Sequence, residues 1–437
     1  MSKQTQTTDT EIQKVVLVAV EKPNQKATFE YTIEEFKNLA IANNLEVTQV
    51  VTQKLDRPVS GTYFGSGKIE ELKEVVQATE STLVISNDDL TATQIRNLEK
   101  LIGENILVVD RTALILDIFA SRAKTKIAKL QVRLAQKQYQ LPRLHTSLAN
   151  ELDQQGGAGG GSFTSRGAGE TKLELSRRVI EEQISKMKIE LKEILANSNT
   201  QRKQRDASGI PTVTLVGYTN AGKSTWMNRM IEKYTQSNSS EDKTVFEKDM
   251  LFATLDPTVR TLRLPNNRQI LLSDTVGFVS NLPHDLIASF NSTLQEAVNA
   301  DLLVQVVDIS DPHYREMMET TEKTLIEIGA DKVPMVTVFN KADRASIAFP
   351  SREGNTITAS AFDSQSQEYF INLIIDKVFG QIEEITLLIP FSKGNIVNEI
   401  NNSVKVLSQE FENEGTLLKT ELTASEKEKY QEFIRLN

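Results

Sequence analysis

The sequence lacks cysteine altogether and contains only three histidines among its 437 residues. The absence of cysteine excludes disulfide bonds, thiolate catalysis and zinc sites built on cysteine ligands. His145, His284 and His313 are widely separated along the chain, so they do not indicate a metal cluster.

Long apolar segments are missing as well. The chain has no run of about 18 apolar residues, the length that a membrane-spanning helix requires. Its first residues, Met1 to Lys14, are rich in Ser, Thr and Gln and have no apolar core, which favours a frayed tail over a signal peptide. We expect a cytoplasmic protein with no membrane span, and we take it to be a monomer.

Positive charge is scarce overall but concentrated in one segment. The net charge of −9 argues weakly against a nucleic-acid partner. However, residues 118–178 contain eleven Lys and Arg against four Asp and Glu, and residues 118–150 contain no acidic residue. A basic segment in an acidic protein is typical of a region that binds a polyanion.

The N-terminal part of the chain alternates short apolar runs with amphipathic stretches. In chain order these segments are 15–20, 33–43, 69–79, 83–86, 91–102 and 106–110. The alternation predicts a small α/β domain over residues 14–117, after a disordered tail at 1–13. The tetrapeptide Gly65-Ser-Gly-Lys68 lacks the first glycine and the long loop of a phosphate-binding loop, so it indicates a turn before a helix.

A different period begins near residue 118. Apolar residues recur mainly at three- and four-residue steps along two stretches: Ala123, Ile127, Leu130, Leu134 and Leu141, and then Leu173, Ile180, Ile184, Met187, Leu191 and Ile194. Two such helices, each of about 20–25 residues, predict an antiparallel coiled-coil hairpin over 118–198. Pro142 is expected to end the first helix. The polar segment 199–209 is predicted to be a linker.

The loop between these two helices is rich in glycine. Seven of the 20 glycines of the chain lie between Gly156 and Gly169. Such a composition is found in flexible linkers. A linker, however, does not need Phe163 or Arg166, and a backbone without side chains can approach RNA closely. We therefore favour a functional tip.

The segment 210–380 again alternates strands and helices, and a small α/β domain is predicted for 381–437. Thr212–Val216 reads as a buried strand, and it is followed by a G-x4-G-K-[ST] motif that leads into a helix. In this context the loop backbone cradles phosphates, Lys223 contacts the β- and γ-phosphates during catalysis, and Ser224 binds Mg²⁺. The predicted phosphate-binding residues are Gly217, Tyr218, Thr219, Asn220, Ala221, Gly222, Lys223, Ser224 and Thr225.

Two further elements of a nucleotide switch follow the phosphate loop. A strand ends in Asp274-Thr-Val-Gly277, in which Asp274 is expected at Mg²⁺ and the Gly277 N–H at the γ-phosphate. A threonine that closes on Mg²⁺ and the γ-phosphate is needed between Ser224 and Asp274. Thr254 is our choice for this metal-binding and catalytic role, and Thr258 is the alternative.

The guanine base is specified by a third motif. In Asn340-Lys-Ala-Asp343, the Asp343 carboxylate can accept hydrogen bonds from the guanine N1 and N2 edge, which adenine does not offer. Lys341 is expected to lie over the base, and Asn340 to tie this loop to the phosphate loop. Ser360 and Ala361 complete the predicted pocket, so the cofactor is GTP or GDP with Mg²⁺.

The residue after Gly277 is Phe278, where many switches have a glutamine that orients the attacking water. Phenylalanine cannot do this, so hydrolysis is expected to be slow without help supplied in trans or by a monovalent ion. Asn220 is placed to ligate such an ion, and K⁺ is the ion we consider.

Taken together, these segments resemble the HflX family of ribosome-associated GTPases, over nearly the whole chain beyond its first 13 residues. The specific segments are 62–72, 109–120, 128–132, 139–144, 277–286 and the Gly-rich 166–170 followed by Arg177-Arg178. The resemblance implies binding to the large (50S) ribosomal subunit and its rRNA, splitting of stalled or idle 70S ribosomes, and GTP hydrolysis that the subunit stimulates. The basic residues that would then contact rRNA are Arg122, Lys124, Lys126, Lys129, Arg133, Lys137, Arg143, Arg166, Arg177 and Arg178.

Departures from the family pattern leave other functions open. Leu175-Ser176 stands where the family usually has Thr-Asp, and the loop 159–166 is slightly atypical. These differences leave room for a specialised paralogue that displaces ribosome-targeting antibiotics. A GTPase switch that recruits a protein effector through the coiled coil is a second alternative. An ATP-driven RNA remodeller with a second nucleotide site in the N-terminal domain is a third.

Overall fold

The computed structural model describes residues 12–26, 28–103, 105–144, 165–206, 209–235, 252, 255, 258–280 and 291–435. The chain forms two compact units: unit 1 comprises residues 1–196 with 250–252 and 280–290, and unit 2 comprises the remainder. Within the described ranges, no helix is long and apolar enough to cross a membrane.

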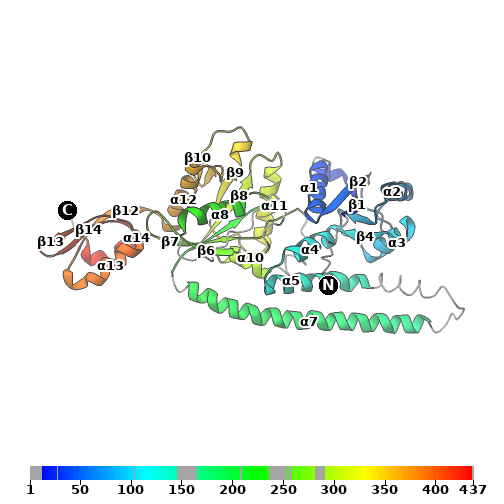
Figure 1. The fold of residues 1–437 in the computed structure, drawn as a ribbon, viewed down its shortest axis with the longest axis horizontal. Helices are drawn as coiled ribbons and strands as arrows, with labels where there is room; N and C mark the ends of the chain where they lie inside the picture. Colours follow the sequence, from blue (N-terminus) through cyan, green and yellow to red (C-terminus); the bar gives the residue numbers. More distant parts are fainter. Residues whose placement is uncertain are drawn as a thin grey trace, which may run out of the picture. The chain divides into compact units, whose positions relative to one another are not determined.

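Unit 1 begins with a four-stranded parallel sheet of order β2-β1-β3-β4 (Figure 1). Its strands are β1 (Gln13–Glu21), β2 (Leu45–Lys54), β3 (Leu83–Ser86) and β4 (Leu107–Asp110). The helices that connect and follow them are α1 (Phe29–Ala42), α2 (Ser66–Thr79), α3 (Ala92–Ile102) and α4 (Arg111–Arg122). Buried aliphatic side chains from β1, α2 and α3 pack together with Phe64 as one core.

The predicted strands and helices of this part are therefore present, but strand β2 and helix α4 were missed. β2 lies at the sheet edge and is largely half-exposed, with Thr and Gln among its residues, so its sequence does not stand out as apolar. Gly65 caps α2, as the turn interpretation requires, and its N–H donates to the Gln53 Oε1 at 3.0 Å.

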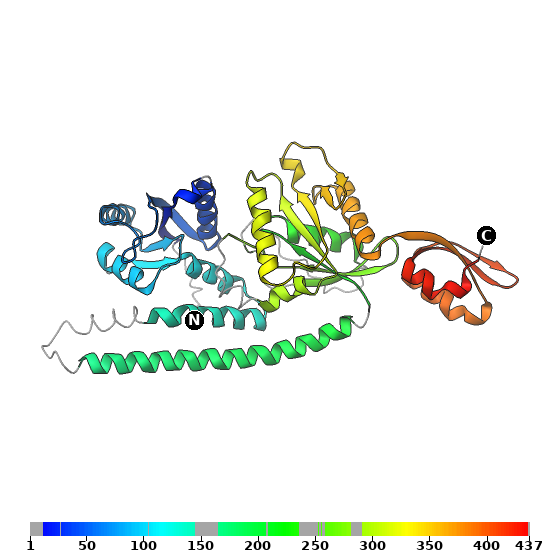
Figure 2. The same cartoon turned by 180° about the vertical axis from the view of Figure 1, so that it is seen from behind.

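Within unit 1, helix α5 (Lys126–Gln140) and the part of helix α7 (Ser165–Asp206) up to residue 196 lie side by side and antiparallel, as Figures 1 and 2 show. A 3₁₀ turn at Leu141–Arg143 follows α5. The seam contains the predicted Leu130, Leu134 and Ile184, which are buried. The Lys126 Nζ lies 2.8 Å from the Glu190 Oε1 across the pair.

The predicted lengths of these helices were wrong. α5 has 15 residues because Thr125 caps its start, its side chain accepting a hydrogen bond from the Ala128 N–H, and because Pro142 follows its end. α7 has 42 residues and continues to Asp206, through most of the segment predicted as a linker. That segment is polar, but between Asn199 and Asp206 it contains no proline or glycine, and its Gln, Arg and Lys residues favour helix.

Unit 2 contains a seven-stranded sheet of order β10-β11-β9-β8-β5-β7-β6, parallel except where β10 and β6 pair with their neighbours. The strands are β5 (Thr212–Val216), β6 (Thr258–Arg263), β7 (Gln269–Asp274), β8 (Leu302–Asp308), β9 (Met335–Asn340), β10 (Ser351–Glu353) and β11 (Thr356–Thr358). The helices are α8 (Lys223–Tyr234), α10 (Asn291–Val298), α11 (Tyr314–Glu327) and α12 (Ser364–Phe379). Strand β5 is central and buried, so the loop that follows it opens at the carboxyl edge of the sheet.

A small three-stranded antiparallel sheet of order β12-β14-β13 forms the end of unit 2. Its elements are β12 (Ile382–Ile389), α13 (Gly394–Ser403), β13 (Val406–Glu412), β14 (Gly415–Thr423) and α14 (Ala424–Lys429). The predicted helix 395–407 ends early, and its last residues begin β13. This strand is also an edge strand and is mostly exposed, so its sequence carries little apolar pattern.

Candidate nucleotide site and basic hairpin

The predicted phosphate loop joins β5 to the start of α8. Gly222 caps the helix with a φ of 96°, a conformation that strongly favours glycine. A Cβ at this position would lie only 2.2 Å from the Asn340 Nδ2. The glycine therefore permits both the left-handed turn and the close approach of the base-recognition loop.

Lys223 is buried inside this loop. Its Nζ donates to the carbonyl oxygens of Gly217, at 3.0 Å, and Tyr218, at 2.7 Å. Burial lowers the pKa of Lys223 to about 8, although the nearby Asp274 carboxylate acts in the opposite direction. The amine is thus held among carbonyl dipoles at the place where phosphates are expected.

Asp274 ends β7 beside the first turn of α8 and is fully buried. The Ser224 hydroxyl donates to the Asp274 Oδ2 at 2.7 Å. A hydroxyl and a carboxylate in this arrangement are the oxygen ligands that Mg²⁺ prefers, so these two residues fit a magnesium ion.

The backbone of Gly277 and Phe278 runs against the phosphate loop. The Phe278 N–H donates to the Gly217 oxygen at 3.2 Å, and the Thr219 N–H donates to the Phe278 oxygen at 2.8 Å. A Cβ on Gly277 would lie 2.8 Å from the Thr219 Cα and 3.1 Å from the Lys223 Nζ. The Phe278 side chain is buried, so it is not available to orient a water molecule.

The two candidate switch threonines are placed differently. Thr254 lies outside the described residues. Thr258 is the first residue of β6 and pairs with Asp274 of β7 in the antiparallel sheet. It is therefore a strand residue next to the predicted Mg²⁺ site.

The base-recognition residues line a cavity of about 150 Å³. The lining consists of Asn220, Gly222, Thr225, Asn340, Lys341, Asp343, Arg344, Ser360, Ala361 and Phe362. The Asn340 Nδ2 donates to the Ala221 oxygen at 2.8 Å, which is the expected tie to the phosphate loop. The Ala361 N–H donates to the Asn340 Oδ1 at 3.2 Å, so this loop is also joined to Asn340.

One residue of this pocket region was not predicted from the sequence. Lys341 has a φ of 59°, and its Nζ lies 2.7 Å from the Asp308 Oδ2. Asp308 ends β8 and is paired in register with Asn340 of β9. The sequence could have indicated Asp308, because it is an acidic residue at the carboxyl end of a buried parallel strand, where ligand sites of such sheets lie.

Exposed cations follow one side of α5. Lys126, Lys129 and Arg133 are exposed and Lys137 is half-exposed, at spacings that place them on one helix face. Within the described part of the chain, Lys129, Arg133 and Lys137 form no ion pair. A groove of about 460 Å³ beside α7 is lined by three cations, three glutamines and a methionine: Arg133, Gln136, Lys137, Gln140, Gln183, Lys186 and Met187.

The remaining predicted rRNA-binding residues differ in their position and in their contacts. Lys124 is exposed near the start of α5, and Arg177 and Arg178 are exposed on α7, with the Arg177 Nε 2.9 Å from the Glu181 Oε1. The Arg122 Nη2 donates to the Ala42 oxygen at 3.2 Å. The side chain of Arg166 lies outside the described residues.

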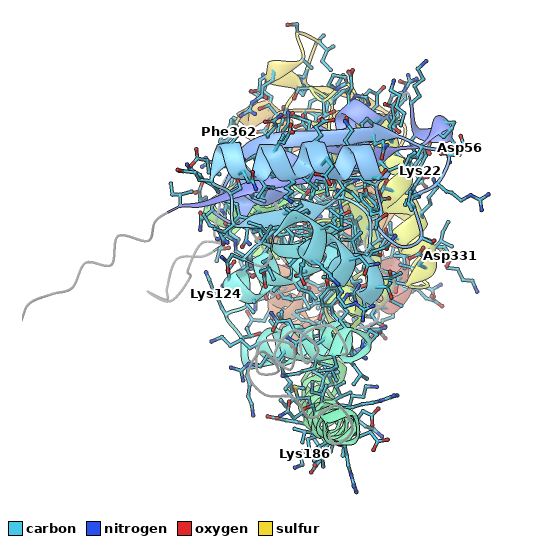
Figure 3. The ribbon with its side chains drawn as sticks, turned by 90° about the vertical axis from the view of Figure 1, so that its right-hand side faces the viewer. Lys22, Asp56, Lys124, Lys186, Asp331 and Phe362 are labelled. Carbon is cyan, nitrogen blue, oxygen red and sulfur yellow. The ribbon has the colours of Figure 1, made fainter. Side chains whose placement is uncertain are left out.

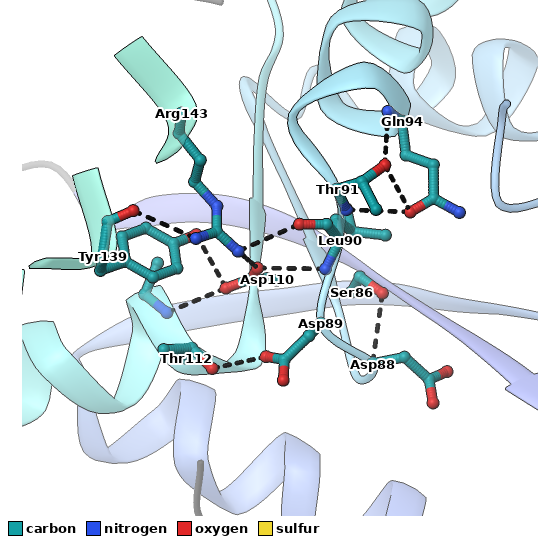
Figure 4. Close-up of polar contacts among 11 residues, drawn as sticks. Ser86, Asp88, Asp89, Leu90, Thr91, Gln94, Asp110, Thr112, Tyr139 and Arg143 are labelled. Carbon is teal, nitrogen blue, oxygen red and sulfur yellow. Dashed lines mark hydrogen bonds and ion pairs between the residues drawn. The ribbon is translucent and has the colours of Figure 1, made fainter. Parts of the chain in front are cut away.

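The Arg143 side chain contacts Asp110, Leu90 and Tyr139 within unit 1 (Figure 4). Its Nη2 donates to the Asp110 Oδ2 and to the Leu90 oxygen, both at 3.0 Å, and its guanidinium stacks 3.7 Å from the centre of the Tyr139 ring. The Tyr139 hydroxyl donates to the Asp110 Oδ1 at 2.8 Å. Burial raises the pKa of the Asp110 carboxyl, although Arg143 acts to lower it. Arg143 thus joins the end of α5 to β4.

The strand order of unit 2, its phosphate loop and its base-recognition loop define a P-loop protein that binds guanine nucleotides. Three family models match the chain: GTP-binding GTPase N-terminal over residues 30–120, GTP-binding GTPase Middle Region over 122–205, and 50S ribosome-binding GTPase over 212–341.

Known proteins match nearly the whole chain. GTPase HflX of Caldanaerobacter subterraneus is 42% identical over 93% of this chain and 90% of its own length. GTPase HflX of Escherichia coli is 35% identical over 88% of both chains. Among solved structures, the complex of SsGBP with GDP covers 84% of this chain and 98% of its own, at 22% identity and a TM-score of 0.46. The extent and identity of the HflX matches show that the chain belongs to the HflX family of GTPases.

Proposed function

We propose that this GTPase docks on the large ribosomal subunit through the basic face of α5, splits stalled or idle 70S ribosomes in its GTP-bound form, and hydrolyses GTP when the subunit stimulates it. The observation that carries this proposal is the row of exposed cations on α5, three of them without an acidic partner among the described residues. Such a row suits contact with successive phosphates of a nucleic acid. The description of the matched family model, a 50S ribosome-binding GTPase, supports the same partner.

The proposal includes the division of the chain and its site residues. Residues 118–198 form the docking hairpin, 14–117 its supporting domain, 210–380 the GTPase domain and 381–437 a C-terminal domain. Phosphates would be held by the loop 217–225, and guanine by Asp343, with Mg²⁺ on Ser224, Asp274 and Thr254.

Help for hydrolysis is required because Phe278 is buried where other switches have a water-orienting side chain. We assign that help to the ribosomal subunit, and to K⁺ as a second contributor. Asn220 is exposed and lines the pocket, so we assign its side-chain oxygen as a ligand of this ion. Equal hydrolysis rates in K⁺ and Na⁺ would exclude the contribution of the ion.

Co-sedimentation with purified 50S subunits tests the docking proposal. Binding is expected with a non-hydrolysable GTP analogue and is expected to fall when Arg133 and Lys137 are both changed to Glu. The matched control changes Lys323 and Lys332, exposed cations of unit 2, to Glu and should bind normally.

The other outcomes distinguish competing functions. No binding of the wild-type protein to 50S subunits would end the proposal. Binding that is unaffected by the double charge reversal would instead favour recruitment of a protein partner through another surface. Splitting itself is measured by sucrose-gradient profiles of 70S ribosomes, whose 50S and 30S peaks should grow with GTP analogue and wild-type protein.

A further inference from the structure

The stretch of chain that carries both switch segments is bounded at each end by residues of unit 1. Residues 253–279 belong to unit 2 and contain Thr254 and Gly277, the two residues predicted to reach the γ-phosphate. Residues 250–252 before this stretch and residues 280–290 after it belong to unit 1. The contacts of these two flanking segments within unit 1 therefore act directly on the ends of the switch stretch.

The flank that follows the switch stretch is held through its backbone by a buried ion pair. The Ser280 N–H donates to the Glu35 Oε1 at 3.3 Å, and the Ser280 oxygen accepts from the Arg111 Nη2 at 3.1 Å. The Arg111 Nη2 also lies 3.1 Å from the Glu35 Oε2, and both side chains are buried. Arg111 is fixed in turn, because its Nη1 donates to the Asn87 Oδ1 at 2.7 Å. Both backbone groups of Ser280 thus have charged partners, which bind more strongly than neutral ones.

The flank that precedes the switch stretch is held by an aromatic contact. Phe252 is 1% exposed, and its ring packs edge to face on the Phe119 ring, with centres 4.7 Å apart and an angle of 88° between the planes. The φ of Phe252 is 55°, a conformation that a residue with a side chain keeps only where its surroundings hold it. Phe119 and Arg111 both belong to α4, so one helix contacts both flanks.

Helix α4 is suited to transmit a displacement. Seven of its 12 residues are buried, so it cannot shift without moving its neighbours. Only Ala123, Lys124 and Thr125 separate it from α5, the helix of the proposed docking face, and the two helices pack against each other. Figure 3 shows Lys124, in this short link, at the surface. A movement of α5 is therefore passed to α4 over a short distance along the chain.

We infer that α4 couples the nucleotide site to the docking hairpin, through the Glu35–Arg111 ion pair on Ser280 and through Phe119 on Phe252. Ordering of residues 253–279 by GTP constrains both flanks, and through them α4. Such coupling is reciprocal, so a nucleotide that raises the affinity for 50S subunits has its own affinity raised by 50S subunits to the same extent. The ribosomal half of this inference rests on the proposed function, whereas the response of α4 to nucleotide does not.

Hydrogen exchange tests the coupling without ribosomes. Binding of a non-hydrolysable GTP analogue to the full chain should slow amide exchange in α4 of the wild-type protein. The double variant Glu35→Met with Arg111→Met should lose most of this slowing, because it no longer holds Ser280. Apolar residues of similar size usually replace a buried ion pair without loss of stability, so this variant should fold. Equal slowing in both proteins, or none in the wild-type protein at saturating analogue, would overturn the inference.

Two further variants separate coupling from a general loosening of unit 1. Lys22→Met with Asp88→Asn removes another ion pair of unit 1, at 2.9 Å, whose hydrogen bonds among the described residues do not involve Ser280. In this matched control the slowing should persist, and its loss would count against the inference. Phe119→Leu removes the ring contact alone and should reduce the slowing in part.

A thermodynamic cycle extends the test to the docking hairpin. The dissociation constant for 50S subunits should be lower with GTP analogue than with GDP, by about 5-fold or more in the wild-type protein and by less than about 2-fold in the Glu35→Met, Arg111→Met variant. Because the ratio of the two constants is compared, a uniform change of affinity does not affect the result. The same ratio in both proteins would overturn the inference.

Failure of the proposed function gives a different result. If the wild-type protein bound no 50S subunits with either nucleotide, the docking proposal would fail, and with it the ribosomal half of the coupling. The exchange experiment would still decide whether α4 responds to the nucleotide, so the two failures are distinguishable.

Discussion

The buried Lys223 is a residue whose acid–base chemistry is strongly altered by its surroundings. Its pKa in the folded, nucleotide-free protein is about 8, against an ordinary value of 10.5. Between these two values the unfolded chain binds more protons than the folded one, so this group makes the free energy of unfolding rise with pH across that window. Bound phosphates have the opposite preference, because they favour the charged amine.

We therefore predict that GDP binding takes up a proton, increasingly as the pH rises above 8. Calorimetric titrations at pH 8.5 in two buffers with different protonation enthalpies should give different apparent binding enthalpies. Lys223→Met should remove most of that difference, since methionine does not titrate. Identical enthalpies in both buffers for the wild-type protein would show that Lys223 keeps its proton in the free state.

Asp308 provides a second prediction at this scale. The carboxylate fixes Lys341 at 2.7 Å, so Asp308→Asn should weaken GDP binding by about 3- to 10-fold through loss of a charge-assisted contact. Asp311→Asn, three residues further along and also partly buried, is the control and should bind normally. Equal affinities for all three proteins would mean that the ion pair does not position Lys341 for the base.

The nucleotide motifs could be read from the sequence because their residue types and spacings carry the chemistry. The tie from Asn340 to the phosphate loop was predictable in this way. Asp308 could not be, because it acts through Lys341, which only the folded sheet brings near it. Arg143 is the converse case: its charge indicates RNA, but the fold places it on buried Asp110.

At the scale of whole elements, the sequence predicted buried strands and amphipathic helices well and edge strands poorly. β3 is buried along its whole length and has an apolar sequence, whereas β2 and β13 are sheet edges with polar residues. Edge strands are stabilised by their pairing partners, which a local pattern does not reveal. The length of α7 was missed for a related reason, since a polar helix has no apolar stripe to mark it.

Asp110 of β4 accepts hydrogen bonds from the end of α5, and the contribution of this attachment to stability can be tested. Asp110 accepts hydrogen bonds from Tyr139, Arg143 and the N–H groups of Leu90 and Ala113. Asp110→Ala would leave a half-buried guanidinium and a hydroxyl without this acceptor, so we expect the free energy of unfolding to fall by about 2–3 kcal/mol.

Denaturant titration followed by circular dichroism measures this loss, and hydrogen exchange should show faster exchange at the end of α5. Arg133→Met is the control on the same helix, because Arg133 is exposed, and it should change stability by less than about 0.5 kcal/mol. If Asp110→Ala and Arg133→Met were equally stable, Asp110 would not anchor the helix.

At the scale of the whole molecule, the proposal assigns docking and hydrolysis to different residues, so they should be separable by mutation. Lys129→Glu combined with Arg133→Glu changes two exposed cations of α5 and leaves the nucleotide pocket intact. The rate of GTP hydrolysis without ribosomes should therefore stay unchanged. The rate at a fixed, subsaturating concentration of 50S subunits should fall by about tenfold or more, because each phosphate contact contributes to affinity.

Salt provides an independent check on the same variant. The logarithm of wild-type affinity for 50S subunits should fall linearly with the logarithm of salt concentration, and loss of two phosphate contacts should reduce the slope by about 1.5–2. A uniform loss of affinity with an unchanged slope would mean that the charge reversal acts on hairpin structure and not on phosphate contact. A reduced slope with normal basal hydrolysis would locate the polyanion contact on α5, since no other part of the variant has changed.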